Sequence, residues 1–505
     1  MALIPTLSPT LSPTLSKYQM FINGQWVDAQ DGGRFNSLNP ASAQPWASFP
    51  HAQEADVDAA VQAAQDAFEN PTWRSLHATA RGKLLRKLGD LIAANKERLA
   101  QLETNDNGKL IRETMGQIGY MPEFFYYYAG QADKLEGQTL PLDKVDMFAY
   151  TTHEPLGVVA AIIPWNSPMY LTAVKLAPAL AAGNTVVLKP SEHASATIIE
   201  LMHLVKEAGF PDGVVNVVTG FGADTGSALT KHPLVRRIAF TGGSQGAKAV
   251  VKNSAENLAQ LSLELGGKSP NIVFEDADIG SAVNGVIAGI FAASGQSCVA
   301  GSRLLVQETV YDEFLAALKA RAATIVIGDP MAPSSEMGPM ATKPQLALVE
   351  RMVAAAQAQG ATLIHGGKRA ALAGNGWYYE PTILAVDNNQ CSIMQEEVFG
   401  PVASIMRFTD EAHALALAND SEFGLAAGIW TRDNARVHRM SKAVKAGIIW
   451  VNTYRAVSPM GAIGGFKASG YGRESGIDGV KDYTQLKTVW INTSSEPMAD
   501  PFVMR

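Results

Sequence analysis

The sequence has little cysteine, no concentrated positive charge and no long apolar run. Its 505 residues include only two cysteines, so a disulfide framework is excluded and a reducing compartment is expected. Lysine and arginine total 41 against 48 aspartate and glutamate residues, a net charge of −7 with no basic block for nucleic acid. No apolar run reaches about 18 residues, so we expect no transmembrane helix and no membrane partner.

The N-terminus lacks an early basic region followed by an apolar core, which is the pattern of a secretory signal. Its first positively charged side chain is Lys17. Residues 1–17 are instead dominated by a repeated Leu-Ser-Pro-Thr, and closely spaced prolines remove backbone donors, so we expect a disordered tail. A cytoplasmic protein is therefore expected.

The length of the chain exceeds what one hydrophobic core serves, so two or three domains are expected. Between 156 and 275, apolar runs such as 157–163 and 185–188 alternate with helical stretches such as 169–182. A second alternating region extends from about 271 to 450. Such alternation predicts α/β domains built on parallel sheets, with ligands bound at the carboxyl ends of the strands.

Other segments have residue patterns that predict individual helices and strands. Residues 18–27 predict a hairpin with an Asn-Gly turn. Residues 55–69 and 79–101 each predict one helix with an apolar face, and a further helix is expected near 279–293. Residues 488–491 predict an edge strand, and pairing with another subunit would cover its exposed backbone groups.

Cys298 has the setting of a reactive thiol, because its neighbours are small and leave room for a substrate to reach the sulfur: Ala292, Ala293, Ser294, Gly295, Ala300 and Gly301. Upstream, Glu264 stands beside a glycine pair. A thiol nucleophile and a carboxylate base together suit covalent acyl chemistry. Cys391 lacks both the small neighbours and a motif, so we expect it to be structural.

Two stretches, Glu264-Leu-Gly-Gly-Lys-Ser-Pro and Gly295-Gln-Ser-Cys, occur in an order and at a spacing that resemble the aldehyde dehydrogenase superfamily. The resemblance extends from about residue 21 to residue 492. It implies an α/β fold with two doubly wound Rossmann-type parallel-sheet domains and a small β oligomerisation arm. The implied division is an NAD-binding domain at 18–120 and 148–264, a catalytic domain at 265–477, and an arm and C-terminal tail at 121–147 and 478–505.

The resemblance implies oxidation of an aldehyde to a carboxylic acid with NAD. Cys298 would add to the aldehyde, and the thiohemiacetal oxyanion would accept hydrogen bonds from the Asn166 amide and the Cys298 backbone N–H. After hydride loss, water activated by Glu264 would hydrolyse the thioester. Branches of the superfamily that transfer the acyl group to coenzyme A tend to lack this carboxylate. Lys175 resembles a lysine near a proton-relay water, and no metal is expected.

The expected NAD site lies at three strand ends. Glycine clusters at 220–226 and 242–246 let the backbone approach a pyrophosphate near a helix N-terminus, although neither is a G-x-G-x-x-G fingerprint. Glu192 would accept hydrogen bonds from ribose and repel a 2′-phosphate, so NAD is favoured over NADP. The set implied by the resemblance is Ile163, Pro164, Trp165, Lys189, Glu192, Gly222, Gly226, Phe240, Thr241, Gly242, Gly243, Leu265, Glu397 and Phe399.

The substrate tunnel implied by the resemblance has mostly apolar or small lining residues: Ser167, Tyr170, Leu171, Val174, Ser297, Val299, Tyr454 and Arg455. An apolar tunnel disfavours an unpartnered charge, so medium-chain aliphatic or aromatic aldehydes are expected. If Arg455 faces inward, a carboxylate-bearing semialdehyde is the alternative. If Arg455 instead lies at a subunit contact, that alternative is lost. We expect a homodimer or homotetramer.

Two interpretations from other classes stay open. A non-redox thiol esterase would use Cys298 and Glu264 without a nucleotide, and the dinucleotide-binding segments count against it. A catalytically silent binding protein would have no reason to keep Cys298, Glu264 and Asn166 together.

Overall fold

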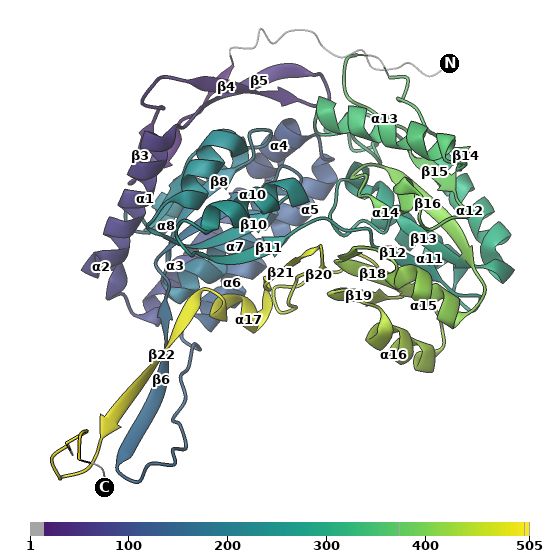
Figure 1. The fold of residues 1–505 in the computed structure, drawn as a ribbon. Helices are drawn as coiled ribbons and strands as arrows, with labels where there is room; N and C mark the ends of the chain where they lie inside the picture. Colours follow the sequence, from purple (N-terminus) through teal and green to yellow (C-terminus); the bar gives the residue numbers. More distant parts are fainter. Residues whose placement is uncertain (1–14, 373, 499, 504–505) are drawn as a thin grey trace.

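Two α/β lobes and a projecting two-stranded arm make up the computed structural model, which describes residues 15–372, 374–498 and 500–503 (Figure 1). Most of the Leu-Ser-Pro-Thr tail lies outside the described residues. Ser16–Lys17 (β1), which we assigned to that tail, instead pairs in parallel with β5 (Gln44–Pro50), and β5 pairs with β4 (Arg34–Asn39). In the described ranges, no helix combines the length and the apolarity needed to cross a bilayer.

The first lobe is built on an eight-stranded sheet of order β21-β11-β10-β7-β8-β9-β2-β3. Its central strands are parallel, which confirms the predicted doubly wound sheet: β11 (Gln260–Glu264), β10 (Val235–Thr241), β7 (Val158–Ile163), β8 (Thr185–Pro190) and β9 (Val215–Val217). Antiparallel strands border it: β21 (Gly470–Tyr471), β2 (Met20–Ile22) and β3 (Gln25–Val27). The β2–β3 hairpin was predicted, and Asn23 and Gly24 have the positive φ that its turn requires.

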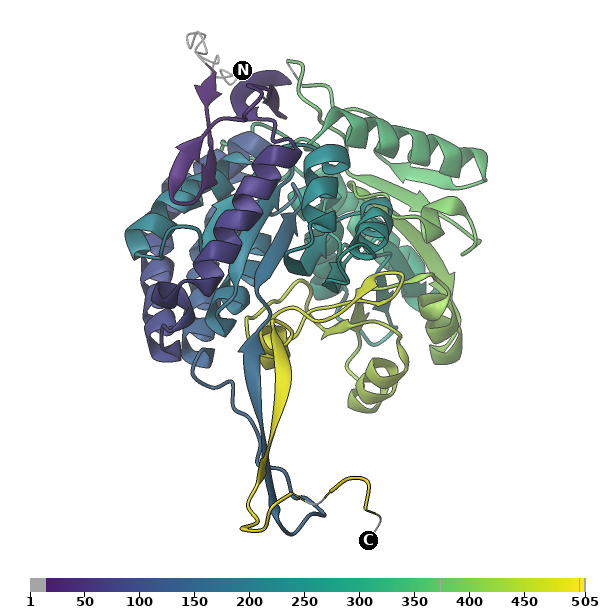
Figure 2. The same ribbon diagram turned by 60° about the vertical axis from the view of Figure 1, so that its left-hand side comes forward.

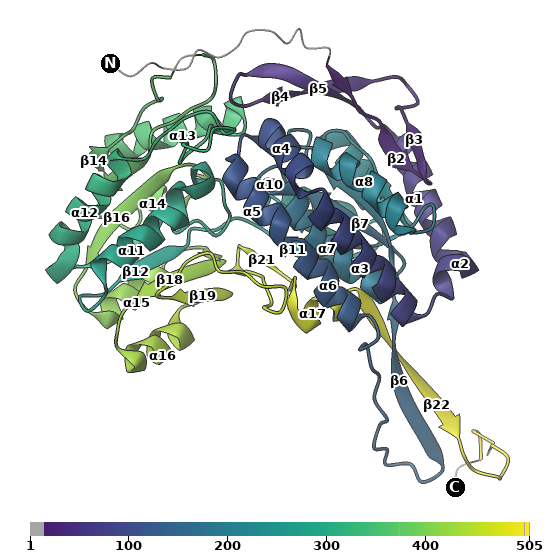
Figure 3. The same cartoon turned by 180° about the vertical axis from the view of Figure 1, so that it is seen from behind.

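Helices cover both faces of this sheet. Val158 and Ala160 of β7 enter one core, whose helices include α1 (Glu54–Glu69), α9 (Ser227–Lys231) and α10 (Ser244–Ser254). Val159 and Ala161 enter the opposite core, seen from behind in Figure 3, with α3 (Ala78–Ala94), α4 (Lys96–Asn107), α5 (Ile111–Tyr120), α6 (Pro122–Gln131), α7 (Pro168–Ala182) and α8 (Ala196–Ala208). Since both faces are buried, β7 is a continuous apolar run without alternation. The short α2 (Pro71–Arg74) follows α1.

Two predicted helices are broken in the structure. The expected helix at 79–101 divides into α3 and α4 at Asn95, whose side-chain amide donates to the Leu91 carbonyl oxygen. An asparagine that binds its own backbone competes with helix continuation. The expected helix at 279–293 is α11 (Ile279–Val286), a π-helical turn and a 3-10 turn. It ends because Ala293 and Ser294 adopt left-handed backbone angles.

The second lobe is built on a seven-stranded sheet in which all neighbours are parallel except β14 and β15. Its order is β14 (Thr362–His365), β15 (Thr382–Ala385), β16 (Val402–Phe408), β13 (Arg303–Gln307), β12 (Pro270–Val273), β18 (Ala426–Trp430) and β19 (Ile448–Val451). One core includes α11 and α12 (Tyr311–Ala323). The other includes α13 (Lys343–Ala358), α14 (Ser392–Gln395), α15 (Glu411–Asn419) and α16 (Asn434–Ala443), and Cys391 packs against it.

The arm consists of β6 (Met147–Pro155) and β22 (Thr484–Asn492), which pair antiparallel over their full lengths and extend away from both lobes (Figure 2). The predicted C-terminal edge strand therefore exists, but it pairs with β6 of the same chain. Phe148, Trp490 and Ile491 are exposed on the arm. Its use in subunit contacts stays a prediction. β17 (Phe423–Gly424) pairs with β20 (Phe466–Lys467). After β20 the chain forms β21 and α17 (Gly476–Lys481) before it reaches β22.

Candidate active site

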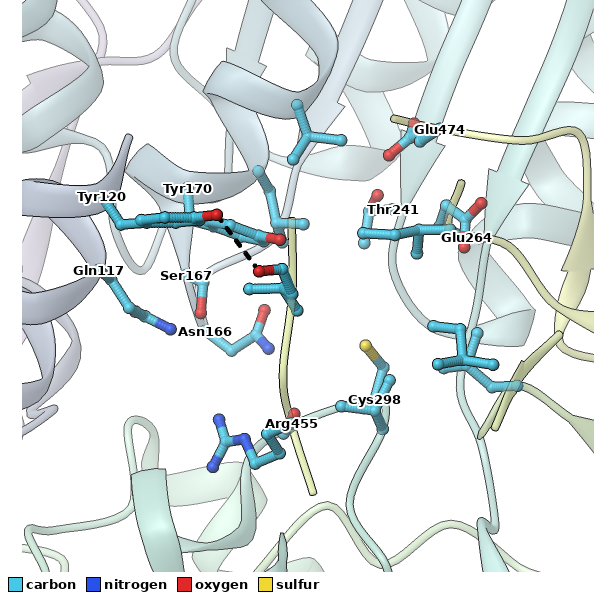
Figure 4. Close-up of a pocket in the computed structure, with 18 of the residues that line it drawn as sticks. Gln117, Tyr120, Asn166, Ser167, Tyr170, Thr241, Glu264, Cys298, Arg455 and Glu474 are labelled. Atoms are coloured by element: carbon cyan, nitrogen blue, oxygen red, sulfur yellow. Dashed lines mark hydrogen bonds between the residues drawn. The ribbon is translucent and has the colours of Figure 1, made fainter. Parts of the chain in front are cut away.

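A cavity of about 340 Å³ is lined by residues of both lobes, and Cys298 forms part of its wall (Figure 4). The first lobe contributes α5, α7 and the carboxyl ends of β7, β10 and β11. The second lobe contributes the segment at Cys298, β19 and the loop that follows β19. Ligand sites at the carboxyl ends of parallel strands are expected for this class of fold.

A strained turn leads into Cys298. Ala293, Ser294 and Gly295 have consecutive positive φ angles of 53°, 53° and 71°. A Cβ at Gly295 would lie 2.0 Å from the Gly400 carbonyl oxygen, so only glycine fits there. Left-handed non-glycine residues cost about 1–3 kcal/mol each and cluster at functional sites, where the surrounding structure holds them. The small residues noted in the sequence therefore build the turn that precedes the thiol.

The environment of Cys298 strongly favours the neutral thiol. The pKa of Cys298 is raised to about 12, mainly by burial and then by the carboxylates of Glu397 and Glu264, in that order of effect. The thiolate is the nucleophilic form of cysteine, so its formation in this cavity requires a change in the local charge or a proton acceptor.

Glu264 lies at the end of β11 and lines the same cavity. Its pKa is raised to about 8, mainly by burial and also by the nearby Glu474, although Lys175 and Arg473 oppose the shift. Within the described part of the chain, its buried Oε1 has no hydrogen-bond partner. A carboxylate with a pKa near neutrality and a free oxygen facing a cavity is suited to act as a general base.

Lys175 reaches this region through an ion pair. Its Nζ binds the carboxylate of Glu474, and both side chains are almost completely buried. Sequence reasoning found Lys175 but missed Glu474, which also lines the cavity. Glu474 follows β21, and the pairing of β21 with β11 brings it to Glu264 from far along the chain. No local motif reveals that strand order.

Asn166 lies just beyond β7, and its Nδ2 donates to the Gln296 carbonyl oxygen at 3.1 Å. This bond joins the predicted oxyanion donor to the turn that carries Cys298. The Gln296 side chain accepts a 2.8 Å hydrogen bond from the Ala341 N–H, which anchors the turn to the second lobe. Gln296 was not predicted as a site residue, although its place two positions before Cys298 was a signal.

The predicted nucleotide residues gather at the strand ends of the first lobe. Lys189 Nζ donates to the Pro190 carbonyl oxygen at 3.0 Å and lies 4.0 Å from the Glu192 carboxylate. Gly243 caps the N-terminus of α10, where an added Cβ would meet no atom within 4 Å. A Cβ at Gly242, by contrast, would lie 2.6 Å from the Phe240 ring. One glycine therefore leaves space for a ligand and the other makes room for an aromatic ring.

Residues of the second lobe approach this group. The rings of Trp165 and Phe399 are in edge-to-face contact at 5.3 Å between centroids. Glu397 Oε1 accepts a 3.1 Å hydrogen bond from the Gly267 N–H, and burial raises the pKa of Glu397 to about 7. The remaining predicted residues lie on the same strand ends and turns of the first lobe: Ile163, Pro164, Gly222, Gly226, Thr241 and Leu265.

Seven of the predicted substrate residues line the cavity: Ser167, Tyr170, Leu171, Val174, Ser297, Val299 and Arg455. Tyr454 does not, because its hydroxyl donates to the Val299 carbonyl oxygen at 2.9 Å and its ring packs on Trp450 beneath the loop. Gln117, Tyr120 and Trp450 also line the cavity but were not predicted as site residues. Gln117 and Tyr120 lie on α5 and Trp450 lies on β19, so the packing of these elements brings them to the site.

Comparison with known proteins agrees with this architecture. The aldehyde dehydrogenase family model matches residues 26–489, so the chain belongs to the aldehyde dehydrogenase family. One curated relative, the (Z)-2-((N-methylformamido)methylene)-5-hydroxybutyrolactone dehydrogenase of Acinetobacter baylyi, is 52% identical over 97% of this chain and 100% of its own length. Human retinal dehydrogenase 2 is 41% identical over 94% of this chain and 91% of its own length.

Solved structures give the same result. The NAD⁺ complex of aldehyde dehydrogenase from Bacillus cereus superposes with a TM-score of 0.93 at 41% identity, covering 95% of this chain and 97% of that one. An aldehyde dehydrogenase from Burkholderia cenocepacia superposes with a TM-score of 0.94 at 43% identity, covering 97% and 99%. The predicted fold is therefore confirmed.

Proposed function

We propose that this protein oxidises an aldehyde to a carboxylic acid with NAD, through a covalent intermediate on Cys298. The observation that carries the proposal is the convergence of Cys298, Glu264 and Asn166 on one cavity. Family membership and the NAD⁺ complex of the Bacillus cereus neighbour support the choice of reaction and cofactor.

The first lobe has the features that a dinucleotide needs. The open space at Gly243 and Gly222 lets backbone N–H groups at a turn and at the N-terminus of α10 approach a pyrophosphate. Glu192 and Lys189 can bind ribose hydroxyl groups, and the Glu192 charge favours NAD over NADP. We assign the nucleotide to the first lobe and the nucleophile to the second. When bound, NAD accepts the hydride.

The side chains of the cavity account for the remaining steps. After deprotonation, the Cys298 sulfur adds to the aldehyde carbon, and the new oxyanion accepts from the Asn166 amide once that amide leaves the Gln296 carbonyl. Loss of hydride from the carbon leaves a thioester. Glu264 then takes a proton from water, which attacks the thioester and releases the acid and the thiolate. The Lys175–Glu474 pair lies beside Glu264 and supports its proton exchange.

The substrate body must suit a mostly apolar cavity. Leu171, Val174 and Val299 favour an aliphatic chain of medium length or an aromatic ring. Arg455 also lines the cavity, and that observation favours the second candidate, a carboxylate-bearing semialdehyde. The name of the Acinetobacter relative points in the same direction, because a 5-hydroxybutyrolactone is the ring-closed form of a 4-oxobutanoate, in which the carboxylate has added to the aldehyde.

The test is NADH formation with a panel of aldehydes: acetaldehyde to octanal, benzaldehyde, and 4-oxobutanoate. We expect turnover by the wild type and its reduction to background in Cys298→Ala, because the covalent route is lost. Cys391→Ser is the matched control and should behave as wild type, since Cys391 lies outside the cavity. NADH formation by Cys298→Ala would sink the covalent mechanism. Ester hydrolysis without any NAD-dependent turnover would instead favour the thiol esterase.

A further inference from the structure

We infer that the end of the cavity away from Glu264 is an anion subsite, which binds a carboxylate at the far end of the substrate. The carboxylate is bound by Arg455, Gln117 and Ser167. Lys109 holds Gln117 and Ser167 in place. This inference rests on the proposed function, and it selects between its two substrate candidates. The substrate class that it defines is a short ω-oxo acid, with the aldehyde at Cys298 and the carboxylate at Arg455.

Lys109, which was not predicted as a site residue, has a buried side-chain nitrogen whose two hydrogen-bond partners are neutral. Its Nζ donates to Gln117 Oε1 at 2.8 Å and to Ser167 Oγ at 2.7 Å. In the described ranges, no carboxylate oxygen lies within 4.0 Å of this Nζ. Burial lowers the pKa of Lys109, while the nearby Glu103 and Glu113 carboxylates oppose that shift without pairing with its Nζ. Lys109 therefore acts in this wall as a buried hydrogen-bond donor that holds two neutral side chains.

The two bonds from Lys109 fix which atoms of its partners face the cavity. Because Lys109 occupies the oxygen of the Gln117 amide, the NH₂ group of that amide is left to donate elsewhere. Ser167 likewise accepts from Lys109, so its own hydroxyl hydrogen is free to donate. Both residues line the cavity, and Figure 4 shows Gln117 with its nitrogen toward the open space. Lys109 thereby turns two neutral side chains into hydrogen-bond donors.

Arg455 supplies positive charge at this end of the cavity. It lines the cavity, and its charge reaches both Lys109 and Cys298. Its Nη1 donates to the Ala288 carbonyl oxygen at 3.2 Å, and no carboxylate in the described ranges lies within 4.0 Å of its guanidinium. The backbone φ of Arg455 is 63°, in the left-handed region, and the surrounding loop must stabilise this unfavourable conformation. The remaining guanidinium N–H groups are available to a ligand.

The opposite end of the cavity has acidic side chains where the Arg455 end has hydrogen-bond donors and positive charge. Glu264 and Glu474 lie there, across the Cys298 sulfur from Gln117 and Arg455 in Figure 4. A substrate carboxylate is repelled at that end and attracted at the other, so one orientation is favoured. Tyr170 contributes a buried hydroxyl without a hydrogen-bond partner among the described residues, which a polar substrate group can satisfy. Leu171 and Val299 supply apolar contact for the methylene groups between the two ends.

The experiment compares 4-oxobutanoate, 5-oxopentanoate and 6-oxohexanoate with unsubstituted n-alkanals of the same chain length, each with NAD. The readout is the ratio of kcat/KM for the oxo acid to kcat/KM for the matching alkanal. We expect the wild type to favour the acid at one or more lengths. In Arg455→Gln the ratio should fall about 10- to 100-fold at that length, as for loss of a charge-assisted hydrogen bond.

A second variant keeps the test independent of folding effects at the loop. Gln117→Glu retains an acceptor for Lys109 but replaces the donor that faces the cavity with a negative charge, so the ratio should again fall about 10- to 100-fold. Lys109 itself is not substituted, because its removal would leave buried partners unsatisfied. Arg432→Gln, which removes an exposed arginine paired with Asp278, is the matched control and should leave the ratio unchanged.

The possible results distinguish failure of the proposed reaction from failure of the subsite alone. A panel without NADH formation from any aldehyde overturns the proposed function and with it the subsite. Turnover of alkanals with no preference for an oxo acid at any length overturns the subsite alone. A preference that survives both Arg455→Gln and Gln117→Glu shows that the carboxylate binds elsewhere and also overturns it. A ratio that falls in both variants and not in Arg432→Gln supports it.

Discussion

The two ends of the cavity are built in different ways. At the reactive end, Cys298 follows a strained turn, while Glu264 and Asn166 stand at the ends of buried parallel strands. At the distal end, Gln117 comes from helix α5 and Arg455 from the loop after β19. The reactive end is thus held by the sheets, and the distal end is assembled from segments that vary more easily.

Because the two ends contact different parts of the substrate, substitutions at them should affect the reaction rates differently. Groups at the reactive end contact atoms that every aldehyde shares, so their loss should slow all substrates by the same factor. Groups at the distal end contact only what distinguishes one substrate from another, so their loss should change the ratio between substrates.

The largest effect is expected from Glu264→Gln, which removes the base and keeps the shape. Turnover should fall about 10²- to 10⁴-fold, because water is no longer activated. In the proposed mechanism Glu264 acts after the thioester has formed, so rapid mixing should show a burst of NADH close to the enzyme concentration. The oxo acid to alkanal ratio should stay at the wild-type value, unlike in Arg455→Gln.

Glu256→Gln, at an exposed position, is the control for Glu264→Gln and should leave turnover intact. A variant that shows neither a burst nor an altered ratio would place the loss before the thioester and contradict the role of Glu264 in hydrolysis. A changed ratio would contradict the division between the two ends.

The comparison also explains what the sequence reveals. The β2–β3 hairpin and the parallel strands follow from local apolar runs and an Asn-Gly turn, and Cys298 and Glu264 stand in short motifs. Glu474 and Lys109 could not be found in this way. Glu474 reaches Glu264 only through the β21–β11 pairing, and Lys109 reaches Ser167 only through the packing of α4 and α5 against the sheet.

Two local breaks were also beyond a periodicity argument. Apolar residues continue with helical spacing through Asn95 and through Ala293, so the pattern predicts single helices there. The side-chain bond of Asn95 and the left-handed angles at Ala293 depend on tertiary contacts that a period does not contain. The second break is the one that shapes the approach to Cys298.

A smaller effect is expected on stability from Lys175→Met, because the reactive end includes a buried ion pair. Removal of one partner leaves the Glu474 carboxylate buried without its cation, which should lower the free energy of unfolding by roughly 3–5 kcal/mol. Urea-induced unfolding measures the change. Lys175→Met combined with Glu474→Gln should recover part of it, since no unpaired charge then remains.

The matched control for that pair is exposed. Arg439→Met breaks the ion pair with Glu411 on the surface, where such pairs are worth about 0–1 kcal/mol, and should barely move the unfolding midpoint. Equal losses in Lys175→Met and Arg439→Met would contradict the view that the reactive end is held by its buried contacts.

The finest distinction concerns the charge around Cys298. In a Cys391→Ser background, the rate of alkylation by iodoacetamide should still rise with pH up to about pH 10, where a free thiol of pKa near 8.5 has levelled off.

Burial is the main reason that the pKa of Cys298 is raised, and Glu397 is the larger of the two carboxylate contributions. Glu397→Gln should therefore lower the apparent pKa, and Glu264→Gln should lower it less, because each removes a negative neighbour that opposes the thiolate. The adjacent and exposed Glu396→Gln should leave the profile unchanged. Equal shifts in Glu396→Gln and Glu397→Gln would mean that net charge, and not the geometry of the reactive end, controls the thiol.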